Sequence, residues 1–547
     1  MKNPYGFFCP VFLFSTLFVS PTFAKPVLTA ETSRPRTSTF PLGEDVIISF
    51  DANPSSDLKL IIDVRNEFGE SVRPQQTVTM TSDDDEAHYM FNAPSDKFGY
   101  YEVHAKLSDG TALSSEGTRP AGFIPYAIVP DPATRVDYGD KLSRFGLQGG
   151  YNKTAFVIPY LGVRYMLTGY NWERLEPDHP DQFIQDRAKA SHAGKRYPEK
   201  IYAFDNPIYG NGSWRTYHIS SVLGAGLPKW ALKENTSGTT CKNFGELNGE
   251  GEKALPKFAL AQAKAFSEDY KYQGSRYYQV TWEPAYPWCY GGTPKGLVKI
   301  HERVYDAIHS SDKNALVAGP TLHIDRLEAQ QLKDLLKEGL AKYIDAVSFH
   351  PKAPWPPEKN GMPGIIRELV DAASTAKGKK IRFIGTEQGL GLKGTELYKA
   401  QGDVRTSLMM LGEGADFDIG FYVADFMDGS KDPGYGYYWN LNPKTNFGTD
   451  KLGPKPIVPA YAAMTYFIDG TVSKGRLPNL RGTQLGYAFQ RDGQSLQVAW
   501  DYDGVSSFRI PPNATICDWV GNCAPSKTES INLSGSPVYV ILNTGKK

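Results

Sequence analysis

Between about residues 131 and 468, short apolar segments alternate with stretches whose apolar residues recur every three or four positions. The apolar segments predict strands, and the spaced stretches predict amphipathic helices. Strands that alternate with helices in this way are typical of βα units and a parallel sheet. Helices are expected over residues 255–270, 294–310, 327–340 and 364–376.

Strands can be counted in the same region, and the count constrains the fold. The segments are 162–168, 216–223, 277–281, 315–319, 344–349, 381–385 and 417–423, with a further place in the ill-defined stretch 227–232. Eight βα units close into a (β/α)8 TIM barrel, whose range with insertions includes a region of about 340 residues. The alternative is a doubly wound open sheet, but no segment has the G-x-G-x-x-G order of a dinucleotide site.

The two ends of the chain have a different pattern. Residues 25–130 and 469–547 contain short alternating strands separated by Gly, Pro, Asn and Asp. Both regions therefore predict β-sandwiches, of which the N-terminal one is expected to be Ig-like. Together with the barrel over residues 131–468, these regions give a multidomain protein, as a chain of 547 residues predicts.

Residues 1–24 are typical of an export signal. Lys2 is followed by an apolar run over residues 7–20, and small residues precede a cleavage position after Ala24. We therefore expect a secreted or periplasmic protein. No other stretch of about 20 apolar residues is present, so membrane insertion is not expected.

The cysteines fit an oxidising compartment. Cleavage after residue 24 removes Cys9 and leaves Cys241, Cys289, Cys517 and Cys523, an even number for which pairing is expected. Cys517 and Cys523 are close enough in sequence to close a local turn. Cys241 and Cys289 then pair across distant loops or stay free.

Charge and motif content exclude several classes of function. Lys and Arg total 60, as do Asp and Glu, so there is no overall attraction for nucleic acid. The nine His show no H-E-x-x-H motif and no Cys/His cluster with zinc spacing, and there is no G-x-S-x-G segment. We expect an enzyme without metal or cofactor.

Two of the predicted strands lead to a glutamate. Glu283 follows the strand over 277–281, fourth in the count, and Glu387 follows the strand over 381–385, the seventh. Active sites of TIM barrels lie at these C-terminal strand ends. Either residue alone is explained as a surface acid, but the pair matches what glycosidic cleavage requires: a proton donor and a nucleophile or base.

The residues around these glutamates resemble the retaining clan A of (β/α)8 glycoside hydrolases, and family 39-like enzymes are the most similar members. The resemblance covers most of residues 131–468, and the flanking β modules resemble accessory domains of such enzymes. It rests on the segments Leu161-Gly-Val-Arg-Tyr, Trp172-Glu-Arg-Leu-Glu-Pro, Trp282-Glu283-Pro284, Asp345-Ala-Val-Ser-Phe-His350-Pro and Thr386-Glu387-Gln-Gly389.

The resemblance implies that Glu283 is the acid/base and Glu387 the nucleophile of a double displacement, with a β-linked poly- or oligosaccharide as substrate. Partial burial and the neighbouring negative charge are expected to raise the pKa of Glu283. The chain departs from the clan at three positions. Trp282 replaces the usual Asn before the acid/base, Leu167 an Arg, and Lys352 an aromatic residue.

Other side chains near predicted strand ends are candidates for binding the sugar. Aromatic faces can stack on pyranose rings, although each is explained equally well by packing. His350 is a candidate for contacting a hydroxyl or orienting Glu387. A disulfide between Cys241 and Cys289 would brace the wall of the cleft. The candidates are Trp172, Trp282, Trp288, His350, Tyr422, Asp425 and Trp439.

Two alternatives to a hydrolase stay open from the sequence. One is a carbohydrate-binding protein whose barrel has lost catalysis, which the departures at Trp282 and Leu167 favour. The other is a transglycosylase of polysaccharide assembly, because transfer and hydrolysis share the covalent intermediate and differ only in the acceptor.

Overall fold

The structure is a computed structural model of the chain. It describes residues 26–53, 58–83, 86–149, 152–169, 171–195, 197, 208–209, 212–270, 274–352, 356–391, 394–425, 434–442 and 450–542. The predicted signal peptide over residues 1–24 lies outside the described residues.

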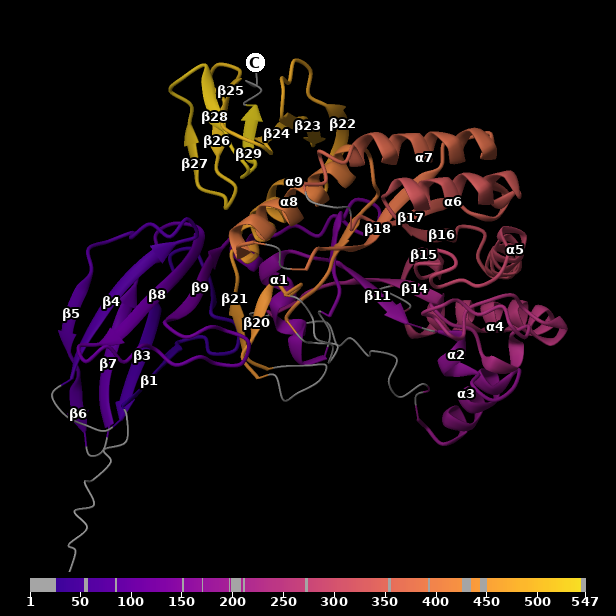
Figure 1. Cartoon of the computed structure of the whole chain (residues 1–547), viewed down its shortest axis with the longest axis horizontal. Coiled ribbons are helices and arrows are strands. Elements are labelled where there is room, and N and C mark those ends of the chain that lie inside the picture. The colour runs from indigo at the N-terminus through magenta and orange to yellow at the C-terminus, as the bar shows by residue number, and fades with distance from the viewer. Residues whose placement is uncertain are drawn as a thin grey trace, which may run out of the picture.

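A closed barrel of eight parallel strands forms the centre of the molecule, as the sequence predicts (Figure 1). The strands follow one another around the barrel in chain order, so each is hydrogen-bonded to its sequence neighbours. They are β10 (Phe145–Leu147), β11 (Tyr165–Gly169), β14 (Tyr217–Gly224), β15 (Gly274–Thr281), β16 (Leu316–His323), β17 (Ala346–His350), β18 (Arg382–Gln388) and β19 (Asp418–Gly420).

The first barrel strand is not where the sequence places it. The stretch 227–232 contains a short 3-10 helix over Lys229–Ala231, whereas β10 closes the barrel between β11 and β19. Because β10 has only three residues, its sequence shows no alternation that a pattern search detects. The segments counted as the first and second strands, 162–168 and 216–223, are therefore the second and third strands of the barrel. Glu283 and Glu387 still follow the fourth and end the seventh strand.

Helices cover the outside of the barrel, and the four helices expected from spacing are confirmed as α4 to α7. In α5, Thr293 caps the first turn, Pro294 takes the first helical position, and the apolar side is buried. None of the described helices is long and apolar enough to span a membrane. The helices are α1 (Ile158–Leu161), α2 (Trp172–Leu175), α3 (Gln182–His192), α4 (Gly249–Asp269), α5 (Pro294–Ser311), α6 (Arg326–Lys337), α7 (Met362–Lys377), α8 (Glu396–Gly412) and α9 (Ile457–Ile468).

The N-terminal part consists of two sheets in the orders β1-β3-β7-β6 and β2-β9-β8-β4-β5. Alternate residues of β3 and β4 are buried, so one side of each sheet faces a separate apolar core. The strands are β1 (Val27–Thr32), β2 (Thr39–Pro41), β3 (Val46–Asn53), β4 (Lys59–Asn66), β5 (Gln76–Thr79), β6 (Thr81–Asp83), β7 (Glu86–Ala93), β8 (Gly99–Leu107) and β9 (Phe123–Val129).

The C-terminal part is antiparallel, with a six-stranded sheet in the order β22-β23-β24-β29-β26-β27 and a separate pair, β25-β28. The strands are β22 (Val472–Arg476), β23 (Gln484–Arg491), β24 (Gln494–Asp501), β25 (Ser506–Arg509), β26 (Thr515–Cys517), β27 (Cys523–Pro525), β28 (Ser530–Leu533) and β29 (Val538–Leu542). Two small hairpins complete the fold: β12 (Ile208–Tyr209) with β13 (Gly212–Ser213), and β20 (Tyr438–Asn440) with β21 (Leu452–Pro454).

The barrel is tied to the C-terminal sheets by a buried ion pair. Arg405 of α8 donates from Nε to Glu358 Oε1 at 2.7 Å, and Trp500 of β24 donates from Nε1 to the same oxygen at 3.0 Å. Removing one partner of a buried pair leaves the other charge uncompensated, so the contact restricts how the two parts can separate. The N-terminal sheets meet the C-terminal part where the Asn522 side chain hydrogen-bonds the backbone of Phe98.

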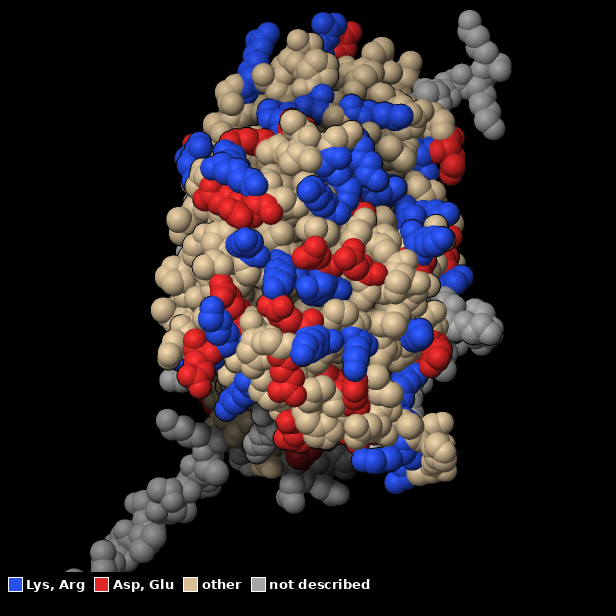
Figure 2. All heavy atoms as spheres, turned by 90° about the vertical axis from the view of Figure 1, so that its right-hand side faces the viewer, with Lys and Arg blue, Asp and Glu red and all other residues tan. Residues whose placement is uncertain are grey.

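Charges of both signs are interspersed over the outer helices. Figure 2 shows Lys and Arg side chains mixed with Asp and Glu on this side of the molecule. This mixture agrees with the equal totals of the sequence and offers no extended field of one sign for a polyanion on this side.

Both predicted disulfides are present. Cys241 and Cys289 are joined with an S–S distance of 2.06 Å and Cys517 and Cys523 with one of 1.97 Å. The first links the loop after β14 to the loop after β15, so it holds together two connections at the C-terminal edge of the barrel.

The two disulfides are expected to differ in their effect on stability. Closing a loop removes more entropy from the unfolded chain when the loop is longer: about 4 kcal/mol for the 48-residue separation of Cys241 and Cys289, against about 2 kcal/mol for the separation of 6. Thermal unfolding of the double variants C241S/C289S and C517S/C523S should show the larger fall in Tm for the first. An equal or reversed order would contradict this account.

Candidate active site

Two glutamates occupy matching positions at the C-terminal edge of the barrel. Glu387 lies in β18 and is 1% exposed, and Glu283 follows β15 and is 7% exposed. Glu283 has a φ of +39°, in the left-handed region. Such a conformation costs a non-glycine residue roughly 1–3 kcal/mol and persists where the surroundings fix it, often at functional sites.

Glu283 is fixed by two histidines from the next two barrel strands. His323, at the end of β16, contacts Glu283 Oε1 through Nε2 at 2.9 Å. His350, at the end of β17, contacts the same oxygen through Nδ1 at 2.7 Å. The other nitrogen of His323, Nδ1, lies 2.9 Å from Glu328 Oε1 in α6. A row of four side chains therefore runs from α6 to the centre of the barrel mouth.

Lys352 connects the two glutamates. Its Nζ lies 3.8 Å from Glu283 Oε1 and donates a hydrogen bond to Glu387 Oε1. Since a hydrogen bond spans roughly 3 Å, the two carboxylate oxygens lie at most roughly 7 Å apart. This limit includes the separation of about 5–5.5 Å that retaining glycosidases use.

The electrostatics of Glu283 differ from the expectation of a raised pKa. Burial raises the pKa of Glu283, but hydrogen bonds from His323 and His350, together with the charge of Lys352, outweigh burial and hold the pKa well below its usual range. The expectation took account of burial and of Glu387, but not of these two donors and the ammonium. Without a ligand, Glu283 is therefore a carboxylate.

His323 carries the proton in this pair. Burial lowers the pKa of His323, but the hydrogen bonds to Glu283 and Glu328 and the charges of both carboxylates raise it to about 10. For Lys352, burial lowers the pKa, and the charges of Glu387 and Glu283 outweigh burial and raise it. The described site thus holds two cations among three carboxylates.

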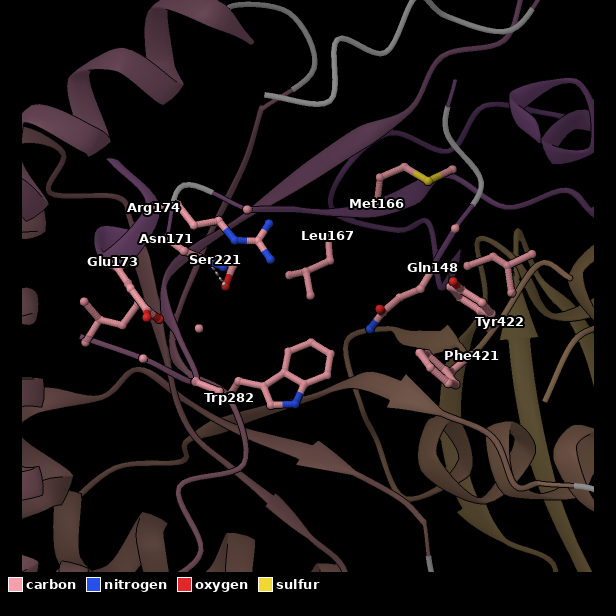
Figure 3. A pocket seen from close by; sticks show the side chains of 17 residues that line it. Gln148, Met166, Leu167, Asn171, Glu173, Arg174, Ser221, Trp282, Phe421 and Tyr422 are labelled. Carbon is pink, nitrogen blue, oxygen red and sulfur yellow. Dashed lines mark hydrogen bonds between the residues drawn. The ribbon is translucent and has the colours of Figure 1, made fainter. Parts of the chain in front are cut away.

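A cleft of about 500 Å³ opens beside the glutamates. Figure 3 shows the side chains of Gln148, Leu167, Arg174 and Trp282 pointing into it. Gln148 donates from Nε2 to Glu387 Oε2 at 3.3 Å, so the wall of the cleft is in direct contact with that carboxylate. Gln148 therefore joins the wall of the cleft to Glu387, although neither glutamate itself lines the cleft.

Three of the predicted sugar-binding residues lie at this site. Trp282 and Tyr422 line the cleft, and Tyr422 is stacked on Phe421 with ring centroids 4.7 Å apart. His350 is fully buried, with its ring edge-on to that of Trp282. It contacts Glu283 rather than Glu387, the residue that it was expected to orient.

The structure places the other four elsewhere. Trp172 is fully buried and stacks on Phe258, so it belongs to the core. Asp425 is buried in an ion pair with Lys455 at 2.7 Å. None of these four residues lines the described cleft. The other two are Trp288, which is 42% exposed beside the disulfide, and Trp439, which packs on Lys455.

Sequence reasoning missed His323, Glu328 and Gln148. His323 ends β16, which runs beyond the counted segment 315–319, so the predicted strand end did not point to it. Gln148 follows β10, the strand that was not found. Glu328 lies in the first turn of a helix, and only the structure shows that it reaches back to His323.

Two overlapping groups of side chains have the spacing of metal ligands: Glu283 with His323 and His350, and His323 with Asp325 and Glu328. In the first group the candidate ligand atoms hydrogen-bond to one another. In the second, His323 contacts Glu328, and Asp325 accepts from the backbone N–H of Glu328 at 2.9 Å. Hydrogen bonding accounts for both groups, and an enzyme without metal or cofactor stays a prediction.

Replacing Lys352 by Met should lower stability, and the loss should depend on pH. The ammonium is one of the groups that lower the pKa of Glu283, so its removal raises that pKa from its depressed value. A carboxyl group with a depressed pKa contributes stability that is lost as the pH falls, so the deficit of K352M should be largest where Glu283 is ionised and should shrink in acid. Thermal unfolding at pH 3 and pH 7 should show a larger Tm deficit for K352M at pH 7. The matched control is R174M, which removes an exposed cation that lines the same cleft. An equal deficit for K352M at both pH values would contradict the ion-pair geometry.

Comparison with known proteins supports the fold. No protein-family model matches the chain, and no curated protein matches it. Among solved structures, a family 39 glycoside hydrolase from the gut symbiont Bacteroides cellulosilyticus WH2 has a TM-score of 0.59 and 16% identity, over 94% of this chain and 100% of that chain.

Two further solved structures have lower TM-scores and lower sequence identity to this chain. The catalytic domain of GH30 xylanase C from Talaromyces cellulolyticus has a TM-score of 0.47 and 12% identity, over 74% of this chain and 97% of its own. A monomeric beta-xylosidase from Caulobacter crescentus CB15 has a TM-score of 0.43 and 12% identity, over 74% and 96%. The first match, which spans nearly the whole chain, confirms the expected fold: this chain has the fold of a family 39 glycoside hydrolase.

Proposed function

We propose that the protein is a retaining glycoside hydrolase that cleaves a β-linked poly- or oligosaccharide. The observation that carries the proposal is the convergence of Glu283 and Glu387 on one ammonium, at the ends of the fourth and seventh barrel strands. The cleft beside them supplies room for a sugar chain. A pair of carboxyl groups this close fits glycosidic bond cleavage, in which one gives a proton and the other attacks.

In the proposed first step, Glu387 attacks the anomeric carbon as a carboxylate. The bond from that carbon to the leaving oxygen breaks, and Glu283 in its protonated form gives its proton to that oxygen. In the second step water attacks the glycosyl-enzyme, gives a proton to Glu283, and releases Glu387. Each displacement inverts the anomeric carbon, so the configuration is retained overall.

Lys352 must leave its resting position for this chemistry. Its ammonium lies between the two carboxylates, where a scissile bond between the acid and the nucleophile would have to lie. When a sugar displaces the ammonium, Glu283 loses one of the charges that lower its pKa and is protonated more readily. Binding of the substrate and arming of the acid are thereby coupled.

The cleft supports a carbohydrate ligand. Trp282 and Tyr422 offer aromatic surface to it, while Gln148 and Arg174 offer hydrogen-bond donors. Aromatic faces with a few polar groups are typical of sites that bind sugars in water. The export pattern over residues 1–24 and the two disulfides support a secreted or periplasmic place of action.

A carbohydrate-binding protein without catalysis is the second candidate. The observation that favours it is Lys352, which neutralises both glutamates at the position that the reaction requires to be open. In that case the cleft binds sugar while the ion pair stays intact. Catalytic assays of the glutamate variants distinguish the two candidates.

Replacing Glu387 by Gln should abolish turnover of every glycoside, with a loss of at least roughly 1000-fold in kcat/KM, or about 4 kcal/mol of transition-state stabilisation. E283Q should lose activity on natural glycosidic linkages to a similar degree. It should retain first-step activity on aryl glycosides whose phenol leaves without a proton. Initial rates on a panel of oligosaccharides and aryl glycosides measure both effects.

The matched control is E338Q, which changes an exposed glutamate of the same protein and should behave as wild type. A 2-deoxy-2-fluoro glycoside should label wild type on the peptide that contains Glu387, as mass spectrometry can show. Wild-type rates for E387Q, or a label on another residue, would refute the assignment.

A further inference from the structure

We infer that His323 and Glu328 form a proton store for Glu283, so that the acid of this site is a hydrogen-bonded pair rather than a single carboxyl group. The inference rests on the proposed function. His323 and Glu328 are positioning residues in this account, because they act through Glu283 and do not contact the sugar.

The geometry of the row supports this role. Glu328 Oε1 lies 2.9 Å from His323 Nδ1, and His323 Nε2 lies 2.9 Å from Glu283 Oε1. An imidazole that contacts carboxylates through both nitrogens donates through both, so it is held as an imidazolium. Glu328 is itself fixed, since its Oε2 accepts the backbone N–H of His323 at 2.7 Å.

Burial strengthens the hydrogen bonds of this row of side chains. Glu328 is 6% and Glu283 7% exposed, so water competes little for these hydrogen bonds. A single buried glutamate that accepts from two histidines and lies beside an ammonium stays ionised at neutral pH and is a poor general acid. The adjacent imidazolium supplies the proton that the carboxylate lacks.

The proton transfer is a balanced exchange within the pair. When a sugar displaces Lys352, the N–H bond at His323 Nε2 breaks, its electron pair stays on nitrogen, and an O–H bond forms at Glu283 Oε1. His323 is left neutral, still donating from Nδ1 to Glu328. Glu283 then gives the proton to the leaving oxygen, and the water that attacks the glycosyl-enzyme restores it.

Among the described residues, ionisable groups from α6, β17 and β18 face the pair of His323 and Glu283. Glu328 and Asp325 approach His323 from the start of α6. His350 and Lys352 approach Glu283 from the end of β17, and Glu387 lies beyond Lys352. Glu328 is the charge on the far side of His323 from Glu283, so changing it alters the store without touching the carboxylate that acts.

The first test is kinetic. In E328Q the upper apparent pKa of the kcat/KM profile should shift down by about one pH unit or more on substrates with poor leaving groups, since the imidazolium loses its counter-charge. In H323Q the same pKa should shift down further. The loss of activity in both variants should be smaller on an activated aryl glycoside, whose departure needs no proton, than on a substrate with a poor leaving group. E328D should restore part of the shift.

A merely structural role predicts another result: both kinds of substrate would lose activity together, and the upper apparent pKa would not move. The amide oxygen that E328Q introduces can still accept the backbone N–H of His323, so the local fold of this variant is preserved. An unchanged upper apparent pKa in both E328Q and H323Q would overturn the inference and leave the proposed function standing.

The second test does not need activity. In protein labelled with 15N-histidine, the His323 signals, assigned by their loss in H323Q, should be those of an imidazolium at pH 8. In E328Q the change to the signals of a neutral ring should occur at a pH about one unit or more below that of wild type. A neutral His323 in wild type at pH 8 would overturn the inference. An imidazolium in a protein that cleaves no glycoside would refute the proposed function and the role of the store in it, and would leave only the charge state of His323.

Discussion

The arrangement of the site depends on one electrostatic constraint: two buried carboxylates cannot lie side by side at neutral pH without a cation or a shared proton. Lys352 meets this constraint between Glu283 and Glu387, and His323 meets it between Glu283 and Glu328. Each cation lies between two glutamates. The result is an alternating row of charges across the mouth of the barrel.

The barrel makes this row possible because parallel strands bring their C-terminal ends to one edge. Glu283, His323, Lys352 and Glu387 follow or end the fourth to seventh strands, so neighbouring strands supply neighbouring charges. Below them, aromatic and aliphatic side chains fill the barrel, with Tyr165 stacked on Phe417 at a centroid distance of 4.3 Å. A rigid interior of this kind holds strand ends at fixed separations, which pairs of opposite charges require.

Much of the architecture could be predicted from sequence, because periodicity reports directly on burial. The barrel, helices α4 to α7 and the β-rich ends all have such signals, and the even number of cysteines indicated the disulfides. β10 has none, since three residues are too few to alternate. Trp172 was expected in the cleft because it follows a strand, but its ring is turned into the core, where it stacks on Phe258. Sequence position does not give side-chain direction.

The least predictable part was the ionisation of the site. Glu283 and Glu387 could be found from strand ends, but the contacts of Glu283 with His323 and His350 come from three separate strands. Their effect on its pKa depends on distances that no pattern contains. Lys352 appeared in the sequence as a departure from related enzymes, and in the structure it is the counter-ion of both glutamates.

The most direct test of the central claim is the anomeric configuration of the first product, followed by proton NMR immediately after enzyme is added to a cleavable β-linked oligosaccharide. A double displacement through Glu387 predicts that the β-anomer appears first and then mutarotates. Initial release of the α-anomer would show a single displacement by water, and would contradict the roles assigned to the two glutamates.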